Sequence, residues 1–183
     1  MIPTLLERIK ENDRKALHEF YQKFSVRLFR SAYRYVTNEQ DAGSIVNMSF
    51  YKIFSHMHEF EYKDDKSILA WMNKIVVNEA LMLLRQHISY KETNESNLEK
   101  FKADDFPEEN LALEDYYQLI RRLPDDLRTV FNLFVIDGFS HKEIAAQLNI
   151  RESSSRTYLT RARKMLQDGI IKIQAHHGNE SAG

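Results

Sequence analysis

The chain has 183 residues, of which 43% are hydrophobic, and its 26 Lys/Arg and 27 Asp/Glu give a formal net charge of −1. It contains no cysteine, which excludes disulfides and thiolate zinc sites, and its charged first residues contain no apolar run typical of a signal peptide or membrane span. We therefore expect a cytoplasmic protein whose length suits one large core or two small ones.

The charge is distributed unevenly along the chain. Residues 91–126 carry 5 Lys/Arg against 11 Asp/Glu, whereas the segments on either side are mildly basic. Both ends could therefore contact a polyanion, and the acidic middle could cover a basic surface when no polyanion is bound. The acidic segment is equally well interpreted as a solvated linker.

Apolar residues recur at helical spacing, and only 5 Gly and 3 Pro interrupt them, which predicts an all-α fold. The helices expected in the first half cover residues 5–9, 14–37, 39–57 and 67–88, with a charged loop at residues 58–66. Asp13 and Asn38 suit the N-caps of the second and third helices. The third helix is expected to bury a stripe that contains Ile45 and Met48.

The second half is expected to follow a flexible acidic linker at residues 91–107, where isolated apolar residues cannot form a buried face. We expect a helix at residues 108–122 and another that starts with Pro124 as its first helical residue. The second of these helices is expected to bury a stripe that ends at Val135, and Gly138 to adopt the left-handed conformation after it. Residues 1–90 and 108–173 thus form two small helical domains, and residues 174–183 a disordered tail.

Residues 140–164, "SHKEIAAQLNIRESSSRTYLTRARK", carry the pattern of a helix-turn-helix. Ser140 and Glu143 form a capping box that starts one helix, and Asn149 tolerates the left-handed backbone of a tight turn. The next helix opens near Glu152 and places four small or apolar residues on one face, namely Ser155, Leu159, Ala162 and Leu166. The remaining face is polar and basic, so its N-terminal part is predicted to enter the major groove of DNA.

This geometry assigns roles to the polar face. Arg156 can present a bidentate fork to guanine, Thr157 can touch base edges, and Arg161 is better placed for phosphates. The predicted contacts with duplex DNA are His141, Lys142, Arg151, Ser153, Ser154, Arg156, Thr157, Thr160, Arg161 and Lys164. The alternative is an amphipathic helix with an ordinary solvated face.

In the first half, aromatic residues alternate with cations around Phe60 and Trp71, a pattern that suits unpaired bases stacked on rings. The alternative places both aromatic residues in the core. No nucleotide-binding or zinc-protease motif occurs, and His56 and His58 diverge on a helix, so we expect no catalytic residue, metal or cofactor.

The two halves together resemble a known family, the extracytoplasmic-function sigma factors of bacterial RNA polymerase. The resemblance lies in "DAGSIVNMSFYKIF" and "SILAWMNKIVVNEALMLLR" in the first half and in "LPDDLRTVFNLFVIDGFSHKEIAAQLNIRESSSRTYLTRARKML" in the second. It implies a non-enzymatic factor that joins core RNA polymerase, directs promoter recognition and DNA melting, and is commonly held inactive by an anti-sigma factor. The helix-turn-helix would read the minus-thirty-five element while docked on the β flap.

The resemblance also implies two groups of site residues in the first half. The group that contacts the β′ clamp helices would be Asp41, Ile45, Asn47, Met48 and Tyr51. The group that accepts an unstacked base of the minus-ten element would be Phe60, Tyr62, Lys63, Ser67, Trp71, Lys74, Asn78 and Arg85.

The sequence departs from the family pattern in the expected polymerase-binding helix. Gly43, Ser44, Asn47 and Met48 stand where the family usually has other polar residues. An alternative function is an autonomous helix-turn-helix regulator that binds duplex DNA without polymerase, as a dimer on a two-fold site. That alternative leaves the first domain without a role, and no heptad seam for dimerisation is evident.

Overall fold

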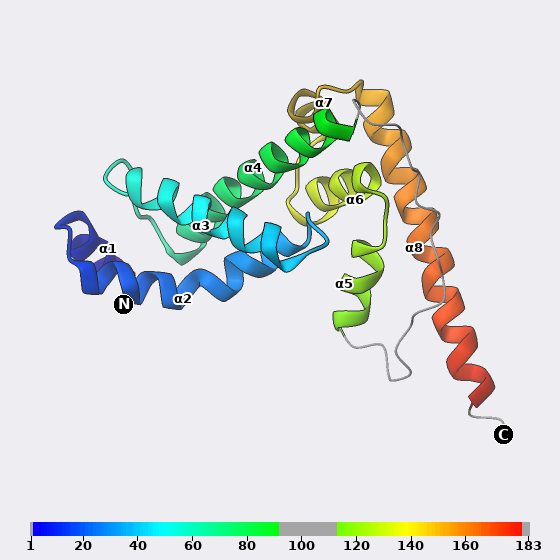
Figure 1. Cartoon of the computed structure of the whole chain (residues 1–183), viewed down its shortest axis with the longest axis horizontal. Coiled ribbons are helices and arrows are strands. Elements are labelled where there is room, and N and C mark those ends of the chain that lie inside the picture. The colour runs from blue at the N-terminus through cyan, green and yellow to red at the C-terminus, as the bar shows by residue number, and fades with distance from the viewer. Residues whose placement is uncertain (1, 92–112, 181–183) are drawn as a thin grey trace. The chain divides into compact units, whose positions relative to one another are not determined.

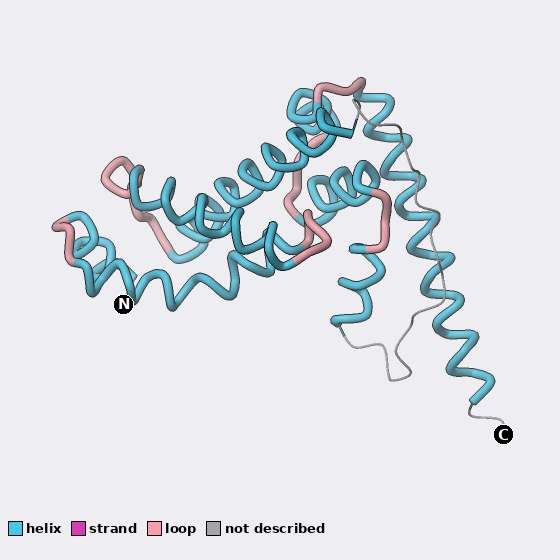
Figure 2. The backbone as a smooth tube through the Cα atoms, in the orientation of Figure 1, coloured by secondary structure: helices cyan, strands magenta, loops and turns pink. Residues whose placement is uncertain are grey.

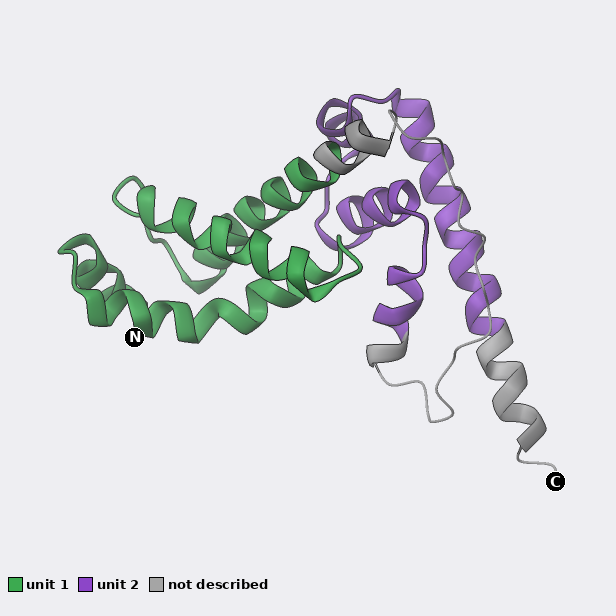
Figure 3. Cartoon of the chain, viewed as in Figure 1, with its two compact units in different colours: residues 1–95 green, residues 96–183 purple. Residues whose placement is uncertain are grey.

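A computed structural model describes residues 2–91 and 113–180, with side chains described for residues 2–85 and 116–171. Helices form all of the secondary structure in these ranges (Figure 2), which confirms the all-α fold. The chain divides into two compact units, Met1–Glu95 and Ser96–Gly183 (Figure 3). The division falls within the predicted linker, most of which lies outside the described residues.

Unit 1 contains α1 (Ile2–Lys10), α2 (Arg14–Tyr33), α3 (Glu39–Ser55) and α4 (Asp65–Lys91), as Figure 1 shows. The predicted caps are confirmed, because Asp13 accepts the amide of Lys15 at 2.8 Å and Asn38 accepts the amide of Asp41 at 2.7 Å. Helix α2 ends earlier than expected, and α4 begins earlier, at Asp65.

The core of unit 1 lies between α2, α3 and α4, which pack on one another. Phe20 of α2 is fully buried, with ring centroids 4.6 Å from Phe24 and 5.8 Å from Phe54. Between Asp65 and Arg85, α4 is long and apolar enough to cross a membrane by length and composition alone. Its apolar side chains are used in this core, however, since Met72 and Val76 are each 0% exposed.

The buried face of α3 differs from the predicted stripe. Met48 is 46% exposed, whereas Ser49 and Phe50 point into the core. Ser49 tolerates burial because its hydroxyl donates to the carbonyl of Ile45 at 2.7 Å, within its own helix. The prediction that Met48 is buried was therefore wrong, because a serine that bonds to its own helix can replace an apolar residue in the core.

Unit 2 contains α5 (Leu113–Arg121), α6 (Asp125–Phe131), a π-helical turn η1 (Asn132–Ile136), α7 (His141–Leu148) and α8 (Glu152–Glu180). Helix α8 packs against α5, α6 and α7. A Cβ at Gly169 would lie 2.8 Å from a methyl carbon of Leu119, so glycine allows this close approach of α5 to α8. Arg128 is 2% exposed and donates to the carbonyl of Arg121, the last residue of α5, at 3.0 Å, which ties α6 to the end of α5.

Three expectations for unit 2 were wrong. Pro124 is the residue before α6 and not its first helical residue. The wider turn of η1 rotates the chain, so that Leu133 is buried and Val135 is 47% exposed, although Val135 was predicted to be buried. Helix α8 continues to Glu180, where a disordered tail was expected from residue 174.

Candidate nucleic-acid interface

The helix-turn-helix is built by the predicted local chemistry. Ser140 and Glu143 form the complete capping box, and the Ser140 amide donates to the Glu143 carboxylate at 2.8 Å. Asn149 has φ 55° and ψ 43°, the left-handed conformation expected for the turn between α7 and α8. The face of α8 that packs inward carries Ser155, Leu159 and Ala162, all buried. The opposite face of the helix carries exposed polar and basic side chains.

The N-terminal half of α8 presents an adaptable polar surface. Arg156 is 63% exposed and pairs with Glu152 one turn earlier. The hydroxyls of Thr157 and Thr160 donate to helix carbonyls at 3.0 Å each, so these hydroxyls are occupied by the helix. Their methyl groups remain available for apolar contact, which is how threonine contacts a thymine methyl.

His141 lies beneath this surface and is half-buried. Its Nδ1 is 2.9 Å from the Ser155 hydroxyl, and its ring stacks on Phe134 with centroids 4.4 Å apart. Burial and then the positive charge of Arg156 hold the pKa of His141 below its usual range. The His141 ring therefore joins α7 to α8 in its neutral form. The Arg163 guanidinium lies 5.9 Å from the centroid of the same Phe134 ring.

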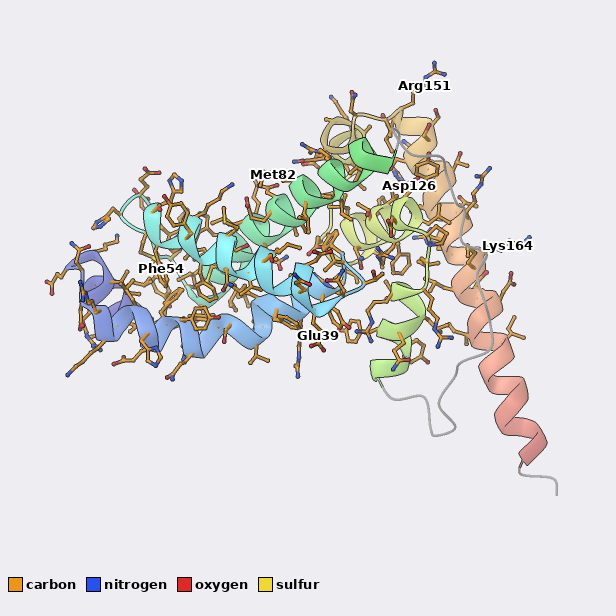
Figure 4. The ribbon with its side chains drawn as sticks, viewed as in Figure 1. Glu39, Phe54, Met82, Asp126, Arg151 and Lys164 are labelled. Carbon is orange, nitrogen blue, oxygen red and sulfur yellow. The ribbon has the colours of Figure 1, made fainter. Side chains whose placement is uncertain are left out.

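The structure gathers the predicted duplex-binding residues on one helix-turn-helix. The exposed members are Lys142, Arg151, Ser153, Arg156, Thr157, Thr160, Arg161 and Lys164. His141 and Ser154 are half-buried. Figure 4 shows Arg151 and Lys164 extending away from the ribbon.

Unit 1 contains an aromatic cavity of about 580 Å³ beside the loop between α3 and α4. Phe60 and Trp71 stack with ring centroids 4.5 Å apart and planes inclined at 25°. The cavity is lined by His56, Glu59, Phe60, Glu61, Lys63, Trp71 and Ile75. A ring system with a lysine at its edge can accept a base by stacking and hold its phosphate.

The loop that forms the cavity is fixed by the start of α4. Asp64 accepts the Ser67 amide at 2.6 Å, and the Ser67 hydroxyl donates to the Asp64 carbonyl at 2.7 Å. The Tyr62 hydroxyl bonds to the Asp65 carboxylate, which raises the pKa of Tyr62 to about 12. Tyr62 and Ser67 therefore shape the loop, whereas Phe60, Lys63 and Trp71 line the cavity itself.

The remaining predicted single-strand residues lie on α4. Lys74, Asn78 and Arg85 are exposed, and their spacing places them on one face of the helix. Four lining residues were not predicted as part of the site, namely His56, Glu59, Glu61 and Ile75. The alternation of Glu59 and Glu61 around Phe60 was visible in the sequence, but only the fold shows that both border a cavity.

The exposed side of α3 carries most of the predicted polymerase-contacting group. Tyr51 is 69% exposed, Met48 is 46% exposed, and Asn47 is exposed beside them, with Asp41 half-buried in the first turn. Ile45 is only 3% exposed and faces the core. The prediction that Ile45 contacts a partner was therefore wrong, because it supports the helix from within.

Known proteins share both units of this chain. A protein of Salmonella typhimurium named ECF RNA polymerase sigma-E factor is 26% identical over 182 residues, covering 91% of this chain and 93% of its own. Residues 20–88 match the family model of sigma-70 region 2, and residues 113–166 match that of sigma-70 region 4. The chain belongs to the extracytoplasmic-function sigma factors.

This sigma factor therefore binds core RNA polymerase and promoter DNA and directs transcription initiation. The RNA polymerase sigma-H factor of Pseudomonas aeruginosa is 23% identical over 179 residues, covering 91% of this chain and 92% of its own. The fold is similar to that of the sigma factor RpoE in its co-crystal structure with the anti-sigma factor NepR from Bartonella quintana. That likeness has a TM-score of 0.50 at 21% identity and covers 83% of this chain and 96% of the other.

Proposed function

We propose that this sigma factor opens promoters by holding two DNA elements with its two units. The observation that carries the proposal is the aromatic cavity of unit 1, since an autonomous regulator of duplex DNA has no use for a site that accepts unstacked bases. The cavity would take an unstacked base of the minus-ten element, with Phe60 and Trp71 as stacking surfaces and Lys63 beside the phosphate.

Melting on this account needs no chemical step. Unstacking and unpairing a base costs a few kcal/mol. Stacking on aromatic side chains contributes about 1–3 kcal/mol per base, which offsets most of that cost. The exposed face of α4, with Lys74, Asn78 and Arg85, would hold the backbone of the same strand. We therefore propose that the protein acts by binding and catalyses no reaction.

The helix-turn-helix would read the minus-thirty-five element as duplex. Arg156 and the Thr157 methyl group would contact base edges near the start of α8. Lys142, Arg151, Arg161 and Lys164, all exposed, would contact phosphates and fix the register. His141 would act from behind, since its ring is occupied by Phe134 and Ser155.

The exposed side of α3 would contact the β′ clamp helices of the polymerase, and unit 2 would dock on the β flap. Met48 and Tyr51 give α3 an apolar and aromatic surface, without acidic side chains at the positions of Ser44 and Asn47. We expect this contact to depend on apolar burial more than on charge, and hence to be only weakly sensitive to salt.

We also propose that an anti-sigma factor covers these surfaces when the protein is inactive. The similar fold in the Bartonella quintana complex is that of a sigma factor bound to the anti-sigma factor NepR, which supports the proposal by precedent. Work at the polymerase implies that the protein is located in the cytoplasm.

Two single substitutions separate the two proposed steps. Holoenzyme with Phe60→Ala should still bind its promoter as duplex but leave the thymines of the minus-ten element unreactive to permanganate. Holoenzyme with Arg156→Ala should bind the promoter more weakly, by about 1–3 kcal/mol, because it loses a base contact. Each variant serves as the control for the other. Normal melting by Phe60→Ala would contradict the role proposed for the cavity.

A further inference from the structure

Helix α1 contacts Phe60, a residue that lines the aromatic cavity, although the helix lies outside the segment that matches sigma-70 region 2, residues 20–88. The ammonium group of Lys10, the last residue of α1, donates to the backbone carbonyl of Phe60 at 3.2 Å. The two residues are 50 positions apart in the sequence, and the bond is partly buried. A residue outside the matched segment thus holds the backbone of a residue whose ring lines the cavity.

Helix α1 is held firmly in unit 1, so the backbone of Lys10 has a defined position. The inner face of α1 is buried through Ile2, Leu5, Leu6 and Ile9. On the outer side, Arg8 donates to Asp13 at 2.8 Å and to Glu19 at 3.0 Å, which ties α1 to the start of α2. These bonds raise the pKa of Arg8 and lower the pKa of Asp13, so both groups stay charged.

Few other hydrogen bonds hold the backbone around Phe60 in place. Residues 60–64 lie between α3 and α4 and belong to neither helix. The Phe60 amide makes only a long bond, 3.3 Å, to the Met57 carbonyl. The Lys10 bond holds the opposite side of the same residue, its carbonyl, while the ring stacks on Trp71. Together these contacts set where the ring lies.

We propose that Lys10 is a positioning residue for the single-strand site, which makes α1 a support of the cavity. The inference rests on the proposed function of that cavity as a base-binding site. Lys10 does not touch the base. It keeps Phe60 against Trp71, so that the stacking surface is already formed before DNA binds. The free energy of binding is then not reduced by the entropy cost of ordering Phe60.

Trp71 is the only tryptophan of the chain, so its fluorescence reports on the cavity directly. The test compares the full-length protein with Lys10→Met, which removes the donor and keeps a long side chain, and with Lys10→Arg, which restores a donor. Lys15→Met, at an exposed position near the start of α2, is the control for the same change elsewhere. The readouts are acrylamide quenching of Trp71 and the thermal unfolding midpoint of each variant.

We expect Lys10→Met to raise the ratio of unstacked to stacked Phe60 about fivefold, equivalent to ~1 kcal/mol for the lost hydrogen bond, and so to increase quenching of Trp71. Lys10→Arg should quench like the wild type, and so should Lys15→Met. Unchanged quenching in Lys10→Met, or an equal increase in Lys15→Met, would overturn the inference. Global unfolding of Lys10→Met would be detected as a lowered thermal unfolding midpoint. Lys10→Arg would then decide the question, because quenching of Trp71 in that variant that differs from the wild type also overturns the inference.

A second readout separates the inference from the proposed function. Single-stranded oligonucleotides of ten dA, dC or dT residues are titrated against each variant, again followed through Trp71. If the wild type binds, Lys10→Met should bind up to about fivefold more weakly, because a smaller fraction of molecules has the formed site. Equal affinity would overturn the inference. If the wild type binds none of them, the base-binding function fails, whereas the quenching comparison still decides whether Lys10 positions Phe60.

Discussion

Lys52 of α3 and Glu79 of α4 form an ion pair across the core of unit 1, with Nζ and Oε1 2.5 Å apart. The Glu79 side chain is 3% exposed, whereas that of Lys52 is 41% exposed. A carboxylate so well buried needs a counter-charge, since an isolated charge in the interior is strongly unfavourable. The pair therefore holds together the two helices that carry the proposed polymerase surface and the proposed single-strand surface.

Removal of only one partner should be costly. We expect Lys52→Met to lower the free energy of unfolding by about 2 kcal/mol, less than for a fully buried pair because Lys52 is partly solvated. The double variant Lys52→Met, Glu79→Met should lose less than the sum of the single variants. Urea unfolding followed by Trp71 fluorescence measures all the corners of this cycle. Strict additivity would show that the pair is not coupled.

The pH dependence of unit 2 should contain a contribution from His141. The folded-state pKa of this group is lowered from 6.5, so the unfolded chain binds the proton more readily. The contribution is therefore fully present above pH 6.5 and is lost as the pH falls below 6.5 toward the folded-state pKa. Urea unfolding of unit 2 by circular dichroism, repeated with His141→Gln, checks this. If His141→Gln loses as much stability at low pH as the wild type, the loss is caused by other groups.

The stability of unit 2 should depend on whether glycine or alanine replaces Asn149 in the turn between α7 and α8. Asn149 has φ 55°, where a Cβ costs roughly 1–2 kcal/mol unless the side chain is asparagine-like. We expect Asn149→Ala to destabilise unit 2 by about 1 kcal/mol and Asn149→Gly to be nearly neutral. Urea unfolding followed by circular dichroism compares the two. Equal stability of both variants would mean that the turn can relax to another conformation.

Salt dependence should separate phosphate contacts from base contacts on α8. Replacing Arg161 and Lys164 together by alanine should reduce the slope of log K against log salt for holoenzyme and promoter DNA by about 2, because roughly 0.9 is lost per phosphate contact. Arg156→Ala should instead alter the preference among base pairs at one position. Titrations at several salt concentrations test this. An unchanged slope for the double variant would place both cations away from the backbone.

Features determined by local chemistry could be predicted from the sequence. The capping box of Ser140 and the left-handed Asn149 depend on residues within one turn of each other, and both are present. Predictions that depended on tertiary packing were less successful. Ile45 and Met48 were expected in one buried stripe and in one partner-contacting group, but Ile45 is buried and Met48 exposed, while Ser49 is buried through a bond to its own helix.

Residue type was enough to group side chains that lie close together, whereas contacts between distant segments were missed. Phe60, Lys63 and Trp71, which the sequence grouped by their interleaved aromatic and basic pattern, line one cavity. The bond from Lys10 to Phe60 joins segments 50 residues apart, and no spacing rule connects them. The outward turn of Val135 depends on the π-helical turn η1, for which the sequence has no recognised signal.

The most direct test of the account is run-off transcription with purified core RNA polymerase on genomic fragments, with and without this protein. We predict transcripts that appear only when the protein is present, start at a limited set of promoters and disappear with Phe60→Ala. A protein that forms no complex with the polymerase, yet binds duplex DNA tightly by itself, would contradict the account.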